Sequence, residues 1–161
     1  MLWTRPMLTA TAADVMALLP GADFADSYCA TVDDMLDAIE ATERMLGHLP
    51  GWIERLLTLR NILVAPLGLK TGVHPNAAVK RWIGTFPVLS ETPERVMLGF
   101  DDRHLNFLAV VDIKSAAGDR REVTATTLVQ THNLLGRIYL DIVIPFHRRI
   151  VPALLLQTAH S

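Results

Sequence analysis

Two carboxylates and an imidazole lie close together in the sequence at Asp101, Asp102 and His104. General acid–base catalysis uses these groups, so the cluster is a candidate site for proton transfer. Aspartate also favours turns, and His104 shares the parity of Asn106, on the side of a strand opposite its apolar face. We therefore favour a hairpin turn here, with Asp101 retained as a candidate to orient a catalytic base.

Two other histidines are candidates for that base. His132 lies between Thr131 and Asn133, where a strand is expected to pass into a helix, and asparagine is typical of a helix N-cap. His147 follows Pro145, which removes a hydrogen bond from its helix and frees a carbonyl in an apolar stretch. A structural role is the favoured interpretation of each histidine, with catalysis as the alternative.

The sequence gives little support to metal or covalent chemistry. No two histidines are spaced i,i+4, and Cys29 is the only cysteine, so we expect no metal site and no disulfide. The sequence contains no Gly-x-Ser-x-Gly run and no Gly-x-Gly-x-x-Gly run, so we expect neither a nucleophile elbow nor a dinucleotide cofactor.

A second kind of site is an apolar pocket with a few polar groups, which is how proteins orient small ligands. Arg60, Thr127 and Tyr139 are the polar candidates, and Phe107 and Phe146 are the apolar ones. For Arg60, extension of the guanidinium to the surface is an equally favourable alternative.

The elements that must position these residues follow from hydrophobic periodicity. Apolar residues alternate at residues 86–88, 96–100, 105–113 and 122–130, and the short turns between these strands require antiparallel pairing. An earlier strand is predicted at Phe24–Ala30. The apolar face of the third of the four strands is Leu105, Phe107, Ala109, Val111 and Ile113.

Three helices complete the prediction. The first begins at an N-cap at Thr31 and ends at Gly47, and the second carries apolar residues from Trp52 to Val64. Residues 70–84 are predicted to be a long connection with one short turn. The last helix spans 134–160, with Asn133 as N-cap and bends at its two prolines. The order is β-α-α-β-β-β-β-α, an α+β fold.

Composition indicates one globular domain. The chain has 161 residues, is 50% hydrophobic and has a formal net charge of −2, which excludes disorder and makes nucleic acid an unlikely partner. We expect residues 1–21 to be an N-terminal extension and 22–160 a single domain. The acidic run from Asp14 to Glu43 predicts one acidic face. The apolar stretch 138–156 carries charges, so we expect no membrane span, and the lone cysteine favours a cytoplasmic location.

Several short motifs resemble those of an uncharacterised bacterial domain-of-unknown-function family. That family belongs to the START and polyketide-cyclase-like superfamily, also called SRPBCC. The likeness covers about residues 22–155, and its motifs are Pro50-Gly51-Trp52, Leu59-Arg60-Asn61, Leu67-Gly68-Leu69-Lys70, the run from Gly99 to Phe107, Thr131-His132-Asn133, Gly136-Arg137-Ile138-Tyr139 and Pro145-Phe146-His147. The resemblance implies a helix-grip fold, in which a curved antiparallel sheet, here of about five strands, wraps a long kinked C-terminal helix.

Three functions follow as hypotheses. The leading one is a binding module that holds a small hydrophobic molecule in a cleft between the sheet and the last helix, oriented by Arg60, Thr127 or Tyr139. The second is a cyclase or dehydratase with His132 or His147 as general base and Asp101 as its orienting group. The third is a non-catalytic partner subunit, because members of the family resemble domains appended to dinucleotide-binding oxidoreductases. A weak homodimer through residues 1–8 is a related expectation. The sequence leaves open whether the protein is an enzyme, and we favour a role without catalysis.

Overall fold

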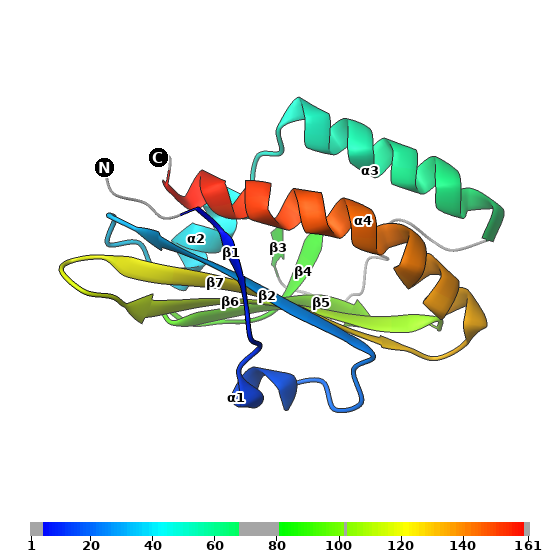
Figure 1. The fold of residues 1–161 in the computed structure, drawn as a ribbon, viewed down its shortest axis with the longest axis horizontal. Helices are drawn as coiled ribbons and strands as arrows, with labels where there is room; N and C mark the ends of the chain where they lie inside the picture. The colour runs from blue at the N-terminus through cyan, green and yellow to red at the C-terminus, as the bar shows by residue number, and fades with distance from the viewer. Residues whose placement is uncertain (1–4, 68–80, 102, 160–161) are drawn as a thin grey trace.

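A computed structural model describes residues 5–67, 81–101 and 103–159 of the chain. Within these residues, seven strands form one antiparallel sheet in the order β1-β2-β7-β6-β5-β4-β3 (Figure 1). The strands are β1 Met7–Thr9, β2 Phe24–Val32, β3 Trp82–Ile83, β4 Phe86–Glu91, β5 Arg95–Asp101, β6 Leu105–Ser115 and β7 Arg121–Thr131. The predicted α+β class and antiparallel pairing are confirmed.

The number of strands was wrong, because the sheet has seven strands and not about five. The additional strands, β1 and β3, lie at the two edges and contain three and two residues. Segments this short show no periodicity. The predicted connection at 70–84 therefore ends in a strand, and its residues up to 80 lie outside the described part of the chain.

The start of the first long helix also differs from the prediction. β2 continues to Val32 and so includes Thr31, which is not an N-cap. Helix α2, Ala38–Leu46, begins after Asp37, whose side chain accepts a hydrogen bond of 2.8 Å from the backbone N–H of Glu40. Several acidic residues precede this helix, so sequence spacing alone pointed to the wrong cap.

The C-terminal helix is the long element that was predicted. Helix α4 spans Leu134–Leu156 and continues as the short 3₁₀ helix η2, Gln157–Ala159. The predicted cap is confirmed, because the side chain of Asn133 accepts a hydrogen bond of 2.9 Å from the N–H of Gly136. Both prolines lie inside α4, and Figure 1 shows its first turns inclined to the remainder.

The elements form layers (Figure 1). α4 lies across one face of the sheet, and helix α3, Gly51–Val64, packs against α4 and runs in the opposite direction. α3 ends in the 3₁₀ helix η1, Ala65–Leu67. The main core lies between the sheet, α2 and α4, with Leu36, Leu98 and Leu155 among its fully buried side chains.

The opposite face of the sheet is covered by residues near the N-terminus. The short helix α1, Ala13–Met16, places Val15 against Leu108, Val110 and Leu128 in a second apolar cluster. β1 meanwhile pairs with β2. The described residues of the N-terminal segment therefore take part in the sheet and its packing.

The acidic residues between Asp14 and Glu43 do not form one acidic face, contrary to our prediction. All eight have partners, and these lie on several different elements. The partners are Arg95 for Asp14, Thr131 for Asp23, His147 for Asp26, Arg120 for Asp33, Arg44 for Asp34 and Glu40, the N–H of Glu40 for Asp37, and Arg81 for Glu43.

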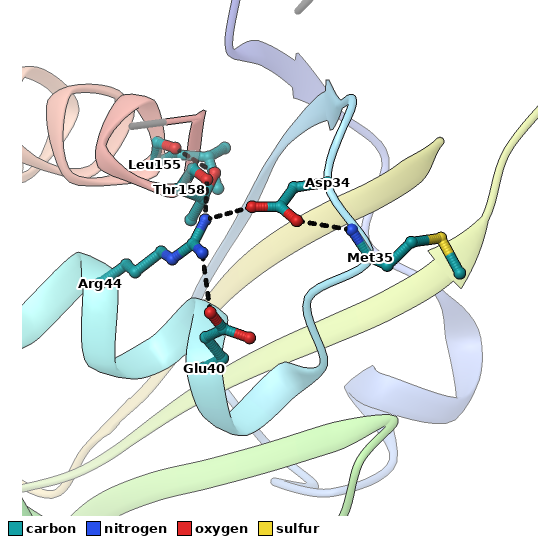
Figure 2. Close-up of polar contacts among 6 residues, drawn as sticks. All are labelled: Asp34, Met35, Glu40, Arg44, Leu155 and Thr158. Atoms are coloured by element: carbon teal, nitrogen blue, oxygen red, sulfur yellow. Dashed lines mark hydrogen bonds and ion pairs between the residues drawn. The ribbon is translucent and has the colours of Figure 1, made fainter. Parts of the chain in front are cut away.

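Arg44 links α2 to η2, the short helix that follows α4 (Figure 2). Its guanidinium donates to Asp34 at 3.0 Å, to Glu40 at 2.7 Å and to the carbonyl oxygen of Thr158 at 3.0 Å. The Thr158 hydroxyl in turn donates to the carbonyl of Leu155 at 2.7 Å. Charge-assisted bonds of this kind are stronger than neutral ones. They hold α2 to η2 and to the segment that follows β2.

Candidate functional site

A cavity of about 200 Å³ lies between the sheet and α4. The sheet forms its floor, α4 forms its roof, and α2 and α3 contribute the side walls. The lining residues used below are Phe24, Phe86, Leu98, Phe100, Phe107, Ala109, Ala125 and Thr127 from the strands, Tyr139, Val143, Phe146, His147, Ile150 and Leu154 from α4, Met45 and Leu46 from α2, and Leu57 and Arg60 from α3. All five predicted ligand-binding residues are therefore in one place.

The cavity exists because small residues occupy the middle of its floor. Ala109 on β6 lies opposite Thr127, and Ala125 on β7 lies opposite Val111. Beside them, Phe107 packs against Phe86 and Phe100 with ring centroids 5.7 and 5.4 Å apart. Large rings at one side and two methyl groups at the centre leave space under the helix that no described side chain fills.

The roof is an apolar stripe on one face of α4. Tyr139, Val143, Phe146 and Ile150 recur at spacings of three and four residues, which places them on one face of α4. Of these, only Ile150 is classed as buried, and the others are half-buried. The stripe therefore lines a cavity and is not part of a fully packed core.

The lining also contains Thr126, whose hydroxyl is hydrogen-bonded to that of Ser27. The four other polar side chains of the lining are Arg60, Thr127, Tyr139 and His147. Thr127 is 7% exposed and projects from the floor, while Tyr139 and His147 belong to the roof. Arg60 belongs to the wall formed by α3. An apolar volume with a few polar groups has the composition of a small-molecule site.

His147 and Asp26 form the most buried polar pair at this site. Nε2 of His147 lies 2.9 Å from Oδ1 of Asp26, and the two side chains are 13% and 10% exposed. The imidazole also meets the ring of Phe24 edge-on, with centroids 5.7 Å apart. Phe24 and Asp26 are two residues apart on β2, so they share a face and hold the imidazole from below.

Asp26 is the site residue that sequence reasoning missed. A weak signal was present, because Asp26 lies at an alternate position of the predicted strand, on the same face as Phe24 and Tyr28. A carboxylate on an otherwise apolar strand face requires a partner. Nothing in the sequence indicates that this partner is 121 residues away.

Two neighbouring groups on β2 stay protonated at neutral pH. Burial, together with the charge of Asp26, raises the pKa of the Tyr28 hydroxyl above its ordinary value. Burial, with a smaller effect of Glu122, raises the pKa of the Cys29 thiol. A thiol with a raised pKa is a poor nucleophile, and Cys29 does not line the cavity.

The other predicted catalytic residues lie elsewhere. Neither His132 nor Asp101 lines the cavity, and both are exposed. The backbone N–H of His132 donates to the carbonyl of His104 at 2.9 Å. The Asn133 amide nitrogen lies 3.0 Å from Nδ1 of His104, so this histidine helps to hold the start of α4. Asp102 lies outside the described residues. The structure thus brings His147, and not His132, to the cavity.

Two features are absent from the described residues. No three histidine, cysteine or acidic side chains lie close enough together to hold a metal ion. No helix there is long and apolar enough to cross a membrane.

The predicted dimer surface is only partly described, because residues 1–4 lie outside the described chain. Met7 and Leu8 on β1 are 64% and 66% exposed, at an edge of the sheet. The homodimer and the oxidoreductase partner remain predictions.

Comparison with known proteins gives one result. A family profile described as "protein of unknown function (DUF2867)" matches residues 18–154, which include β2 to β7 and almost all of α4. No curated protein matches the sequence.

Proposed function

The chain belongs to the DUF2867 family of proteins of unknown function, and we propose that it binds a small hydrophobic molecule between the sheet and α4. The observation that carries this proposal is the cavity of about 200 Å³ with an almost wholly apolar lining. Apolar cavities of about 150 Å³ stay free of water and bind benzene-sized molecules. Four polar side chains supply the few groups that orient a ligand.

The arrangement supports a helix-grip assignment as part of this proposal. An antiparallel sheet curved beneath a long bent helix, with the cavity between them, is what the resemblance to the START and polyketide-cyclase-like superfamily implies. The cytoplasmic location proposed from the single cysteine is compatible with a protonated Cys29 thiol.

The proposal is tested with a variant in which a large side chain fills the cavity. Ala109→Phe places a ring at the centre of the floor, and Ala117→Phe places the same ring at an exposed position in the turn between β6 and β7. A ligand present at a hundred times its Kd stabilises a protein by about 2.7 kcal/mol, which raises Tm by about 5–10 °C for a chain of this size. We expect this rise in wild type and Ala117→Phe, and its loss in Ala109→Phe.

The compounds for this test are monocyclic aromatics, short aliphatic alcohols and medium-chain acids. Native mass spectrometry of protein from its own host, run in parallel, detects a molecule that copurifies. The proposal fails if no compound raises the Tm of the wild type and no copurified molecule is found. It also fails if Ala109→Phe binds as well as Ala117→Phe.

The His147–Asp26 pair favours an enzyme of the cyclase or dehydratase type as the second candidate function. Asp26 accepts from one ring nitrogen and thereby orients the imidazole, so the other nitrogen is the one that takes a substrate proton. In a dehydration, that proton returns to the leaving hydroxyl, which departs as water. This mechanism needs no metal and no covalent intermediate, and Asp26 takes the orienting role expected for Asp101.

We predict that turnover of a β-hydroxy carbonyl compound, where a screen detects it, falls by about 10²- to 10⁴-fold in His147→Gln. His48→Gln, at an exposed position on another element, is the matched control. Gas or liquid chromatography of the product measures the rate. Loss of turnover in His132→Gln instead would assign the base to the junction before α4, and unchanged turnover in His147→Gln would remove the catalytic hypothesis.

A further inference from the structure

We propose that the ligand of the cavity is a small monocarboxylic acid, with its apolar body under α4 and its carboxylate bound by Arg60. This inference rests on the proposed function, because it names the class of molecule that the same cavity takes. It is carried by an arginine in an apolar wall that has no carboxylate partner among the described residues.

Arg60 is a half-buried cation that lines the cavity. Arg44, Arg81, Arg95, Arg120 and Arg137 each have an acidic partner within 4.0 Å. For Arg60, no such ion pair is found in the described parts of the chain, and the sequence of residues 68–80, which follows η1, contains no acidic residue. A guanidinium held against apolar side chains gains more from an anion than one in open water.

The contacts of Arg60 occupy one of the two edges at which a guanidinium can bind a carboxylate, and no hydrogen bond among the described residues occupies the other. Nε and Nη2 donate to the side-chain oxygen of Asn61, at 3.2 and 2.9 Å. These bonds use one edge of the planar group and fix its orientation. The remaining N–H donors at the end of the group, one from Nη1 and the second from Nη2, form a fork that matches the two oxygens of a carboxylate. Asn61 therefore acts as a positioning residue.

The other polar groups of the cavity are compatible with an anion near Arg60. Asp26 is the nearest described carboxylate to the roof histidine, but its oxygen is bonded to His147 and it does not line the cavity. Tyr139 offers a phenolic hydroxyl, which can donate to an anion. Thr127 lies opposite Asp26 on the floor and is 7% exposed.

Helix direction gives the site a polar end and an apolar end. α3 and α4 pack together and run in opposite directions, so the C-terminal half of α3 with Arg60 lies beside the N-terminal half of α4 with Tyr139 (Figure 1). From Tyr139 to Leu154, α4 rises by roughly 22 Å, at about 1.5 Å per residue. The lining at the far end, including Met45, Ile150 and Leu154, is apolar. A head group at Arg60 thus leaves the body of the ligand among apolar side chains.

The volume limits the size of that body. About 200 Å³ exceeds the benzene-sized cavity of about 150 Å³ and is smaller than the pockets of about 300–1,000 Å³ that take drug-sized ligands. A single aromatic ring or a medium-length aliphatic chain fits this range, and a membrane phospholipid does not.

The experiment compares three head groups on one chain. Octanoate, octan-1-ol and octylammonium are titrated into the full chain by isothermal calorimetry at neutral pH. A charge-assisted fork is expected to make octanoate bind at least about tenfold more tightly than octan-1-ol. Octylammonium is expected to bind most weakly, because it carries the same sign of charge as Arg60.

Variants of Arg60 test whether this residue causes the preference for octanoate. Arg60→Met keeps most of the aliphatic stem and is expected to abolish the preference for octanoate while octan-1-ol still binds. Arg60→Lys keeps the charge without the fork, so we expect an intermediate preference. Arg55→Met, at an exposed position of α3 that does not line the cavity, is the matched control and should behave as wild type. Circular dichroism checks that each variant is folded.

The outcomes separate this inference from the proposed function. If none of the three compounds binds the wild type, the proposed function fails for this class of ligand and this inference fails with it. If octan-1-ol binds as tightly as octanoate, the cavity takes apolar ligands and the assignment of an acid is wrong. If Arg60→Met retains the preference for octanoate, another group binds the carboxylate and the role of Arg60 is overturned.

Discussion

Gly99→Val is expected to prevent the chain from folding. Gly99 is buried on β5 opposite Leu108 of β6, and a Cβ at this position would lie 2.2 Å from the carbonyl oxygen of Phe107 and 3.2 Å from the Cα of Leu108. Both are backbone atoms of a paired central strand, so they cannot move away without breaking the pairing. Overpacking typically costs about 1–3 kcal/mol where side chains can adjust. Here the obstacle is backbone, and valine adds two more carbons.

Circular dichroism and urea unfolding measure this effect. Gly99→Val should lack a cooperative transition, and Gly99→Ala should be destabilised by about 3 kcal/mol or more, against a total of about 5–15 kcal/mol for a typical domain. Gly51→Ala is the control, because a Cβ there meets nothing within 4 Å and should change stability by less than about 0.5 kcal/mol. A Gly99→Val protein that unfolds at the wild-type urea concentration would show that β5 and β6 are not packed as described.

Leu98→Ala is expected to lower the free energy of unfolding by about 2–5 kcal/mol. Leu98 is fully buried and also lines the cavity, so its loss removes apolar contacts and extends a space that is already present. The walls cannot collapse onto the vacated volume as easily as in a solid core. Chemical denaturation measures the change, and the enlarged cavity should then accept ligands longer than those that bind the wild type.

Leu59→Ala on α3 is the matched control, because this side chain is 46% exposed. We expect a change within about 0.5 kcal/mol for this surface position. Equal effects of the two leucine substitutions would mean that Leu98 does not belong to the core.

Phe107→Ala is expected to lower the free energy of unfolding by less than is usual for a buried aromatic ring, because Phe107 is half-buried at the cavity wall.

The fold was predictable where local patterns are long. The predicted alternation covers residues 105–113 and 122–130, most of the eleven residues of β6 and of β7, and the short turns before these strands require antiparallel pairing. Asn133 was identifiable as a cap because its side chain acts within its own turn. The edge strands β1 and β3 were not predictable, because two or three residues carry no period and their pairing depends on neighbours that are distant in sequence.

The candidate site was predictable only as two apolar faces. The stripe on α4 and the face of β6 indicated which residues meet, and Arg60, Thr127 and Tyr139 were found as polar exceptions on or beside them. Which histidine faces the interior was not predictable, because the bend of α4 and its position over β2 are set by tertiary packing. The partnership of His147 with Asp26 depends on the same packing. The cavity above Ala109 and Ala125 was also not predictable from the sequence, because small residues on a strand are equally compatible with close packing.

The pairing of β2 with β7 has a consequence for the order in which the protein is assembled. Residues 24–32 form a ladder with residues 121–129, so for most of the time the chain is being synthesised β2 has only the three-residue strand β1 as a partner. The meander from β4 to β7 is built from neighbours in sequence and is closed by short turns, whereas joining β2 to it closes a long loop at a larger entropic cost. During that interval the edge of β2 that pairs with β7 has no partner, and the nascent chain exposes it to other molecules. The most vulnerable stage of this protein is therefore its synthesis, before the last strand has left the ribosome.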